Sequence, residues 1–216
     1  MITLYNVPVS SYGCKIRILL THKNMPSETI APPDGYGSPA YCKIIPAGTV
    51  PAIDHDGFRL SDSEAIAEYL NELSPSPPML PANIQERAHA REISRFHDTR
   101  LEPVLRAYFG QVAPASRNPE FIAENAALLQ KRLDQLAQMF TPQPLLFGTD
   151  LTIPDCSFVA SFAIFRVLDE ILNFDITMPD KLVVYEAALA AHPSVIEARD
   201  DYYDALDLWA KAKLSA

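Results

Sequence analysis

Hydrophobic and polar residues follow two different patterns along this chain, and the pattern changes about a third of the way along. Residues 1–73 combine short β-branched runs with two helical patterns, whereas from about residue 84 onward apolar residues recur at helical spacing. The segment 74–81 between them holds four prolines in eight residues, which neither a helix nor a strand ladder tolerates. We therefore expect a first domain at 1–74, a proline-rich linker at 75–83 and a second domain at 84–216.

The first domain reads as a mixture of strands and helices. We expect, in chain order, a strand at Ile2–Tyr5, a helix at Ser11–His22, a strand at Thr29–Ile30, a hairpin of residues 50–54 and 58–60, and a helix ending near Leu73. Asp56-Gly57 is the turn signal of the hairpin. Ser61 and Glu64 have the spacing of a capping box for the last helix. The order βαβ, loop, ββα is that of a thioredoxin-like α/β domain.

The second domain reads as all-α. Asn118-Pro119 is a helix start, and one apolar stripe follows it. The stripe consists of Leu129, Leu133, Leu136 and Phe140. Thr152 and Asp155 form a second capping box, in which the Asp155 carboxylate can reach back to the Thr152 amide. The apolar run 158–172 behind that box predicts a central buried helix.

Composition and charge exclude several classes of function. The net charge of −9, with no cluster of Lys and Arg, argues against nucleic acid as a partner. No apolar run is long enough to span a membrane, and the N-terminal residues do not resemble a signal peptide, so we expect a cytoplasmic protein. Three widely spaced cysteines and five histidines without ligand spacing predict free thiols and no metal site.

Two dipeptides in the first domain suggest a site for an extended peptide. Pro51 has no backbone N–H, and at a strand entry the Val50-Pro51 bond is a candidate for the cis isomer. Such a bend would leave the main-chain groups of Val50 free to pair with a bound peptide. Twelve residues later, Asp62-Ser63 at a helix start offers an acidic partner for an amine and donors for a carboxylate.

Four segments, taken in order, resemble the cytosolic glutathione transferase family over essentially the whole chain. They are residues 9–17 (VSSYGCKIR), 45–53 (IPAGTVPAI), 60–66 (LSDSEAI) and 152–155 (TIPD). The paired serines are similar to zeta-type members and Ser-x-Tyr-Gly to the plant tau type, both of which use a serine. The resemblance implies the glutathione transferase fold, glutathione as co-substrate, a detoxification reaction and a homodimer.

Ser10 is the catalytic residue that the resemblance implies, because serine-type members place a hydroxyl ahead of the first helix to donate to the glutathione thiolate. A hydroxyl donor and a helix N-terminus both lower a thiol pKa. Ser11 is the neighbouring candidate, and both serines could instead be simple N-caps. Cys14 lies beyond the position of the reactive cysteine in omega-type relatives, and we interpret it as a small buried residue rather than a redox thiol.

The resemblance also assigns the glutathione contacts. The main chain of Val50, before a cis Pro51, would pair with the cysteinyl residue, and Ser63 and Asp62 would hold the γ-glutamyl carboxylate and amine. Thr49 occupies a position where many relatives have a lysine or glutamine that meets the glycyl carboxylate. We therefore expect glutathione binding at Thr49, Val50, Pro51, Asp62 and Ser63, with the glycyl end held more weakly than in those relatives, or by Lys43 or another residue.

The second substrate is expected between the two domains. Tyr12, His97 and Tyr108 are candidates for contacting it, with core packing as the alternative for each. The predicted reaction adds the thiol to a small, largely apolar electrophile. A glutathione-dependent isomerase of maleyl compounds, a dehalogenase, and a glutathione-binding module without turnover are the alternatives. Zeta-type isomerases carry a His-Pro pair where this chain has Glu102-Pro103.

Overall fold

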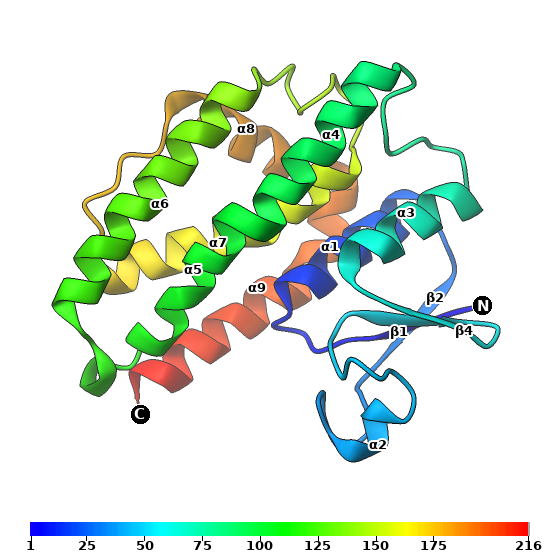
Figure 1. Ribbon diagram of the computed structural model, residues 1–216, viewed down its shortest axis with the longest axis horizontal. Helices are drawn as coiled ribbons and strands as arrows, with labels where there is room; N and C mark the ends of the chain where they lie inside the picture. The colour runs from blue at the N-terminus through cyan, green and yellow to red at the C-terminus, as the bar shows by residue number, and fades with distance from the viewer. Residues whose placement is uncertain (216) are drawn as a thin grey trace.

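A four-stranded mixed sheet is the scaffold of the first half of the molecule in this computed structural model, which describes residues 1–215 (Figure 1). The strand order is β2–β1–β3–β4. β1 (Ile2–Tyr5) runs parallel to β2 (Ser27–Ile30) and antiparallel to β3 (Ala52–His55), and β3 pairs antiparallel with β4 (Phe58–Ser61). The βαβ–ββα order predicted from the sequence is confirmed.

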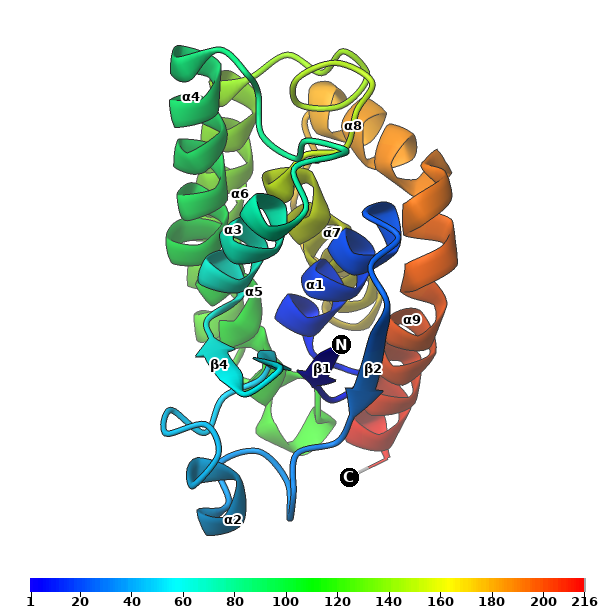
Figure 2. The same ribbon diagram turned by 90° about the vertical axis from the view of Figure 1, so that its right-hand side faces the viewer.

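The helices of this half cover both faces of the sheet. α1 (Ser11–His22) and α3 (Ser63–Leu73) lie on the face toward the helical half, whereas the short α2 (Pro39–Cys42) lies on the opposite side (Figure 2). α1 contacts α3, α7 and α9, and most of its side chains are buried. A small second core forms on the α2 side from Tyr5, Tyr41, Ile45 and Ala52. The sheet therefore holds the N-termini of α1 and α3 next to the helical half.

The second half is entirely helical. Its elements are α4 (Ile84–Phe96), a π-helical turn (His97–Leu101), α5 (Glu102–Ala107), two short 3₁₀ turns (Tyr108–Gln111 and Pro114–Ser116), α6 (Pro119–Met139), α7 (Ile153–Leu172), α8 (Asp180–Ala191) and α9 (Pro193–Leu214). The predicted stripe on α6 is buried at Leu129, Leu133 and Leu136. No helix within residues 1–215 combines the length and the apolar character needed to cross a membrane.

α4 and α5 are joined end to end through the π-helical turn. Pro103, near the start of α5, has no N–H to donate to the preceding turn, so a regular α-helix cannot continue through it. The wider π turn at His97–Leu101 accommodates this break. It also sets which face of α5 meets the first half, and this face carries Glu102 and Arg106.

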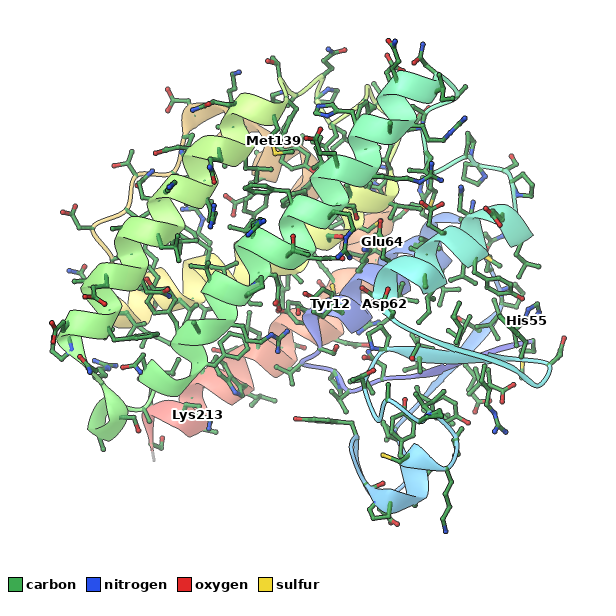
Figure 3. The ribbon with its side chains drawn as sticks, viewed as in Figure 1. Tyr12, His55, Asp62, Glu64, Met139 and Lys213 are labelled. Carbon is green, nitrogen blue, oxygen red and sulfur yellow. The ribbon has the colours of Figure 1, made fainter. Side chains whose placement is uncertain are left out.

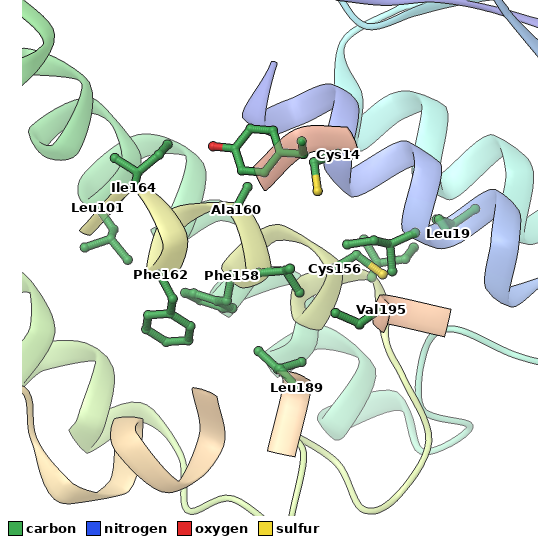
Figure 4. Packing of buried hydrophobic residues seen from close by; sticks show 14 of the residues in the cluster. Cys14, Leu19, Leu101, Cys156, Phe158, Ala160, Phe162, Ile164, Leu189 and Val195 are labelled. Atoms are coloured by element: carbon green, nitrogen blue, oxygen red, sulfur yellow. The ribbon is translucent and has the colours of Figure 1, made fainter. Parts of the chain in front are cut away.

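α7 is the central helix of the core. Its buried side chains pack with those of α1 and α9, and Figure 4 shows Cys14 and Cys156 among these apolar groups. The predicted capping box is present, with the Thr152 N–H donating to Asp155 Oδ2 at 2.8 Å. Asp155 is fully buried and also accepts from the Tyr185 hydroxyl at 2.6 Å and from the Leu146 N–H at 3.3 Å.

The proline-rich segment between α3 and α4 contains no helix or strand, but it is docked on both halves. Met79 is fully buried. Its N–H donates to Asn71 Oδ1 at 2.9 Å, and its carbonyl accepts from the Ile153 N–H at 2.9 Å. The Lys23 ammonium donates to the Pro77 carbonyl at 2.7 Å. These bonds tie the segment to α3, to α1 and to the start of α7.

Candidate functional site

Two adjoining cavities occupy the cleft between the two halves. The first, here the α3 cavity, is about 420 Å³ and lies at the start of α3, where Asp62 and Ser63 line it. The second, here the α9 cavity, is about 370 Å³ and is bounded by Ser10 on one side and α9 on the other. Four residues line both cavities, namely Tyr12, Thr49, Val50 and Arg106. A ligand that spans both cavities would therefore pass Val50 and the start of α1.

The Val50-Pro51 peptide bond is cis, as predicted. Pro51 is buried, and within residues 1–215 the main-chain N–H and C=O of Val50 have no hydrogen-bond partner. The buried Tyr41 hydroxyl donates to the Thr49 carbonyl at 2.9 Å and so fixes the loop before Val50. Val50 thus presents unpaired main-chain groups to both cavities, in the manner of a sheet edge.

α3 begins one residue later than the capping box of Ser61 and Glu64 had indicated. The cap is Asp62, whose Oδ1 accepts from the N–H groups of Glu64 and Ala65, both at 3.0 Å. The helix therefore does not begin at Ser61, which belongs to β4. Asp62 has φ of 79°, a left-handed conformation that is unusual for a residue other than glycine. This conformation puts the exposed Asp62 carboxylate and the N-terminus of α3 at the cavity wall.

Ser63 and Tyr12 both line the α3 cavity. Ser63 is the first residue of α3 and is buried, and Tyr12 belongs to the first turn of α1. Figure 3 shows Tyr12 and Asp62 close together, where the start of α1 meets the start of α3. Two helix N-termini therefore converge on one cavity, and each carries a partial positive charge that favours an anion.

The two serines at the start of α1 have different hydrogen bonds. Ser10 is the N-cap, and its Oγ accepts from the Gly13 N–H at 3.0 Å. No described residue accepts a hydrogen bond from the Ser10 hydroxyl, which lines the α9 cavity. Ser11 is buried, and its hydroxyl donates to Glu102 Oε1 at 3.2 Å. The Ser10 hydroxyl hydrogen is thus available to a ligand, whereas that of Ser11 is engaged.

Arg106 is the main residue of the site that the sequence did not reveal. Its guanidinium pairs with the buried Glu102 through Nη2 and through Nε at 3.2 Å, and Nη2 also donates to Ser11 Oγ at 3.3 Å. It lies over the rings of Tyr12 and Phe109, at 5.7 and 5.4 Å from their centroids. The spacing of Glu102 and Arg106, four residues apart on a helix, was the available signal. Arg106 places a cation where the two cavities meet.

The far wall of the α9 cavity is mostly aromatic. Trp209 packs against Phe109 with ring centroids 4.9 Å apart. Tyr202 lines the cavity from α9, and its buried hydroxyl has no partner among the described residues. Burial, together with the nearby Glu102 carboxylate, raises the pKa of Tyr12 well above its ordinary value, so this phenol stays neutral. Apolar surface with a few polar groups is typical of small-molecule sites.

Two residues predicted to contact the second substrate lie elsewhere. His97 is buried beneath the cleft, where Nδ1 bonds to Asp98 at 2.8 Å and Nε2 to Ser161 at 2.7 Å. Tyr108 is buried against Phe174, with ring centroids 4.5 Å apart. Neither lines the α3 or the α9 cavity, so core packing describes both, and only Tyr12 of the three candidates reaches the cleft.

Cys14 behaves as the sequence interpretation expected. It is fully buried on the core side of α1, and burial raises the pKa of its thiol to about 12. A thiol with this pKa is protonated at neutral pH and unreactive. Within the described residues no group of three or more His, Cys, Asp or Glu side chains could hold a metal ion.

Of the residues considered for the glycyl end of a bound peptide, only Thr49 lies at the cleft. It is exposed and lines both cavities. Lys43, at the end of α2, lines neither. The exposed Tyr36 and the buried Gly48 line the α9 cavity beside Thr49. This rim of the cleft therefore offers main-chain and neutral side-chain groups, whereas the cations Arg95 and Arg106 lie on the side of the helical half.

Residues 4–78 match the family described as "Glutathione S-transferase, N-terminal domain". The chain is 32% identical over 168 residues to the "Probable maleylacetoacetate isomerase" of Caenorhabditis elegans, a match that covers 71% of this chain and 74% of that protein. It is 31% identical over 156 residues to the "Glutathione S-transferase T3" of Arabidopsis thaliana, covering 68% of this chain but only 26% of that longer protein. Among solved structures, a delta-class glutathione transferase of Nilaparvata lugens superposes with a TM-score of 0.84 at 21% identity, covering 99% of this chain and all of that one.

Proposed function

This chain belongs to the glutathione S-transferase family, and on that premise we propose that it activates the thiol of glutathione and adds it to a small electrophile. The observation that carries the proposal is the arrangement at the cleft. The unpaired main chain of Val50, the free Ser10 hydroxyl and the N-termini of α1 and α3 all border the two adjoining cavities. Each of these groups complements a different part of a thiol tripeptide.

Glutathione would lie in the α3 cavity with its γ-glutamyl end at α3. The Ser63 hydroxyl and N–H would donate to the α-carboxylate, where the helix N-terminus adds a favourable field. Asp62 uses Oδ1 as the helix cap, which leaves Oδ2 for the α-amine. The cysteinyl residue would pair with the main chain of Val50, and this pairing would bring its sulfur next to Ser10.

Ser10 is the residue that we propose as donor to the thiolate. Its oxygen is already held by the Gly13 N–H, so the hydroxyl hydrogen is directed away from the helix without a competing acceptor among the described residues. Ser11 would have to release Glu102 to make the same bond. A hydroxyl donor together with the α1 N-terminus stabilises the thiolate relative to the thiol and lowers its pKa. A larger thiolate fraction raises the rate of attack on an electrophilic carbon.

The electrophile would occupy the α9 cavity. Its apolar body would pack against Phe109, Ile164 and Trp209, within reach of the sulfur beside Ser10. In this arrangement the thiolate attacks carbon, and either a leaving group departs with the bonding electrons or the resulting carbanion is protonated. Holding both reactants in adjoining cavities converts a bimolecular encounter into a unimolecular step.

A second candidate is the glutathione-dependent isomerisation of a maleyl compound, and Arg106 is the observation that favours it. A guanidinium at the meeting point of the cavities would bind the carboxylate of such a substrate. The relative from Caenorhabditis elegans is named a probable maleylacetoacetate isomerase. In that reaction the thiolate adds to a double bond, rotation follows, and the same thiolate is expelled, so glutathione is not consumed.

The deciding experiment measures thiolate formation and turnover separately. Ultraviolet absorbance of bound thiolate would be titrated against pH in the native protein and in Ser10→Ala and Ser11→Ala. We expect the native protein to lower the thiol pKa by at least about one unit, equivalent to about 1.4 kcal/mol. Ser10→Ala should lose this shift and Ser11→Ala should keep most of it. An unshifted native pKa would exclude thiol activation, and loss of the shift only in Ser11→Ala would move the role to Ser11.

Turnover would then be assayed with an aryl halide, an epoxide and a maleyl compound. Consumption of glutathione with either of the first two supports the transferase, whereas conversion of the maleyl compound without consumption of glutathione supports the isomerase. Thiolate formation without turnover of any of the three compounds would favour a glutathione-binding module. We also propose that the protein is a cytoplasmic homodimer. Sedimentation of the purified chain would test whether it forms a dimer.

A further inference from the structure

A third cavity lies among α7, α8 and α9. This α8 cavity is about 430 Å³ and its walls are mostly apolar. Phe162 and Ala163 line it from α7, Leu189 from α8 and Leu206 from α9. Figure 4 shows Phe162 and Leu189 within the packed region between these helices. Leu206 also lines the α9 cavity, so this side chain of α9 separates the two spaces.

One cation of the α8 cavity has unused donors. Arg199 lines the cavity, its Nη1 donates to the Ala190 carbonyl at 2.9 Å, and its guanidinium lies over the Tyr203 ring at 5.3 Å from the centroid. Its Nε is buried and has no hydrogen-bond partner among the described residues. The nearest carboxylate oxygen, on Asp200, is 3.9 Å from Nε, which is beyond hydrogen-bond distance. A guanidinium has five N–H donors; that on Nε is enclosed by the protein and one on Nη1 is given to Ala190, so three on Nη1 and Nη2 remain available to a molecule in the cavity.

The other charged groups of the cavity are already paired. Arg166 donates to both carboxylate oxygens of Glu186, through Nε at 3.1 Å and through Nη2 at 2.5 Å. Asp207 accepts from the Lys211 ammonium at 2.6 Å. Once these pairs are set aside, Arg199 is the charge that a bound molecule could complement. The Arg199 side chain is partly buried, with 23% of its surface exposed, and its carboxylate neighbour Asp200 lies at 3.9 Å without hydrogen-bonding to it, so an anion in the cavity has free donors to accept from.

We infer that the α8 cavity is a binding site for a small amphipathic carboxylate, with its acid group on Arg199 and its apolar body against Phe162, Leu189 and Leu206. An apolar cavity of this size with one fixed polar anchor is the usual form of a small-molecule site. The fixed position of Arg199, held by Ala190 and Tyr203, means that little side-chain freedom is lost on binding. The inference does not depend on glutathione binding, because none of the residues that carry it lines the α3 cavity and only Leu206 is shared with the α9 cavity.

The test uses 4-phenylbutyrate as probe and 4-phenyl-1-butanol as its uncharged match, with isothermal titration calorimetry on the purified chain. We expect the carboxylate to bind at least about tenfold more tightly than the alcohol. Binding should persist when S-hexylglutathione saturates the cleft. Arg199→Gln should weaken carboxylate binding about tenfold or more while its glutathione turnover stays unchanged. Ala163→Phe, which fills the cavity from α7, should abolish binding even if Arg199→Gln proves unstable.

Arg106→Gln is the matched control, because it removes a guanidinium from the cleft instead of from the α8 cavity. It should leave the affinity for 4-phenylbutyrate unchanged. The inference is overturned if S-hexylglutathione displaces the carboxylate or if Arg106→Gln weakens it as Arg199→Gln should, because the probe then occupies the cleft. Equal affinity for the alcohol, or no binding at millimolar probe, would overturn it as well.

Discussion

An aspartate helps to cap the start of both α3 and α7, Asp62 as the N-cap itself and Asp155 from inside the first turn, but the two carboxylates have opposite surroundings. Asp62 is exposed at the cleft, uses one carboxylate oxygen for two N–H groups and leaves the other oxygen free. Asp155 is fully buried and accepts hydrogen bonds from Leu146, Thr152 and Tyr185. Both carboxylates accept main-chain N–H groups at a helix start, and the supply of further internal donors decides whether the carboxylate is fully engaged in the fold or keeps an oxygen available to a ligand.

The largest predicted effect is a loss of stability on substitution of Asp155. Asp155→Ala would leave three residues with buried, unsatisfied donors, so we expect the free energy of unfolding to fall by about 3–4 kcal/mol. Urea denaturation followed by circular dichroism would measure it. Asp207→Ala, which removes an exposed carboxylate on α9, is the control and should change stability by no more than about 0.5 kcal/mol. A loss below about 1 kcal/mol for Asp155→Ala would contradict the structural role.

Ser63→Ala should show the reverse pattern, because Ser63 lies in the cleft beside the exposed cap. Loss of a hydrogen bond to a charged carboxylate should weaken glutathione binding by about 1.5–3 kcal/mol, or at least about tenfold in Kd. Stability should stay within about 0.5 kcal/mol of the native value. Ser61→Ala is the matched control on β4, outside both cavities. If it weakened binding equally, the assignment of the γ-glutamyl site to α3 would be wrong.

Substitution of Asp62 separates its capping role from its charge. Asp62→Asn keeps a capping oxygen and tolerates the positive φ, so stability should be close to native. Asp62→Ala should cost about 1 kcal/mol of stability. Both variants lose the negative charge and should bind glutathione a few-fold more weakly, because an exposed ion pair contributes up to about 1 kcal/mol. Native affinity in Asp62→Asn would show that the carboxylate does not meet the amine.

The smallest predicted effect is a pH dependence of stability, which arises where the end of α1 meets the start of α9. The ring centroids of His22 and His192 lie 5.4 Å apart, and burial lowers the pKa of both side chains. The neighbouring positive charges of His192 and Lys23 lower the pKa of His22 further. Because the unfolded chain then binds more protons, this contribution to stability is present above about pH 6.5 and is lost as the pH falls below it. His192 Nδ1 also accepts from the Ser194 N–H at 3.3 Å, which the protonated ring cannot do.

His192→Asn should therefore flatten the dependence of the urea midpoint on pH between 7 and 5. Asparagine keeps a capping oxygen for the start of α9, so stability at pH 7.5 should change little. Facing the pair are Asp150, which raises both pKa values, and Lys23, which lowers that of His22. A native protein whose midpoint does not fall between pH 7 and 5 would show that the pair does not titrate in this way.

The sequence predicted those parts of the structure that depend on local pattern. The strand Ile2–Tyr5 and the helix Ser11–His22 have the expected bounds, because the periodicity and the caps that define them lie within a few residues. The predicted bounds of the hairpin strands differ from the observed ones by up to two residues, because β3 begins only after the bend at Val50-Pro51. The predicted cap of α3 lies one residue before the observed cap, because Asp62 adopts a positive φ that the residue type alone does not reveal.

The two walls of the cleft differ in how much of them could be predicted. The wall from the first half acts through main chain and helix starts, so short motifs around Pro51 and Ser63 indicated it. The wall from the helical half depends on which face α5 presents after the π-helical turn, and this depends on packing between residues distant in sequence. Arg106 was missed for this reason, and His97 was misplaced because the same turn directs it into the core.

Trp209 is a natural fluorescent reporter of the cleft. It is the only tryptophan of the chain, and it lies against Phe109 in the wall of the α9 cavity. Indole fluorescence excited selectively in this protein therefore arises from a single fluorophore at the place where the second substrate is expected. Its intensity and wavelength would follow the filling of that cavity in real time, without a label or a substitution, so association rates could be obtained for electrophiles that are never converted.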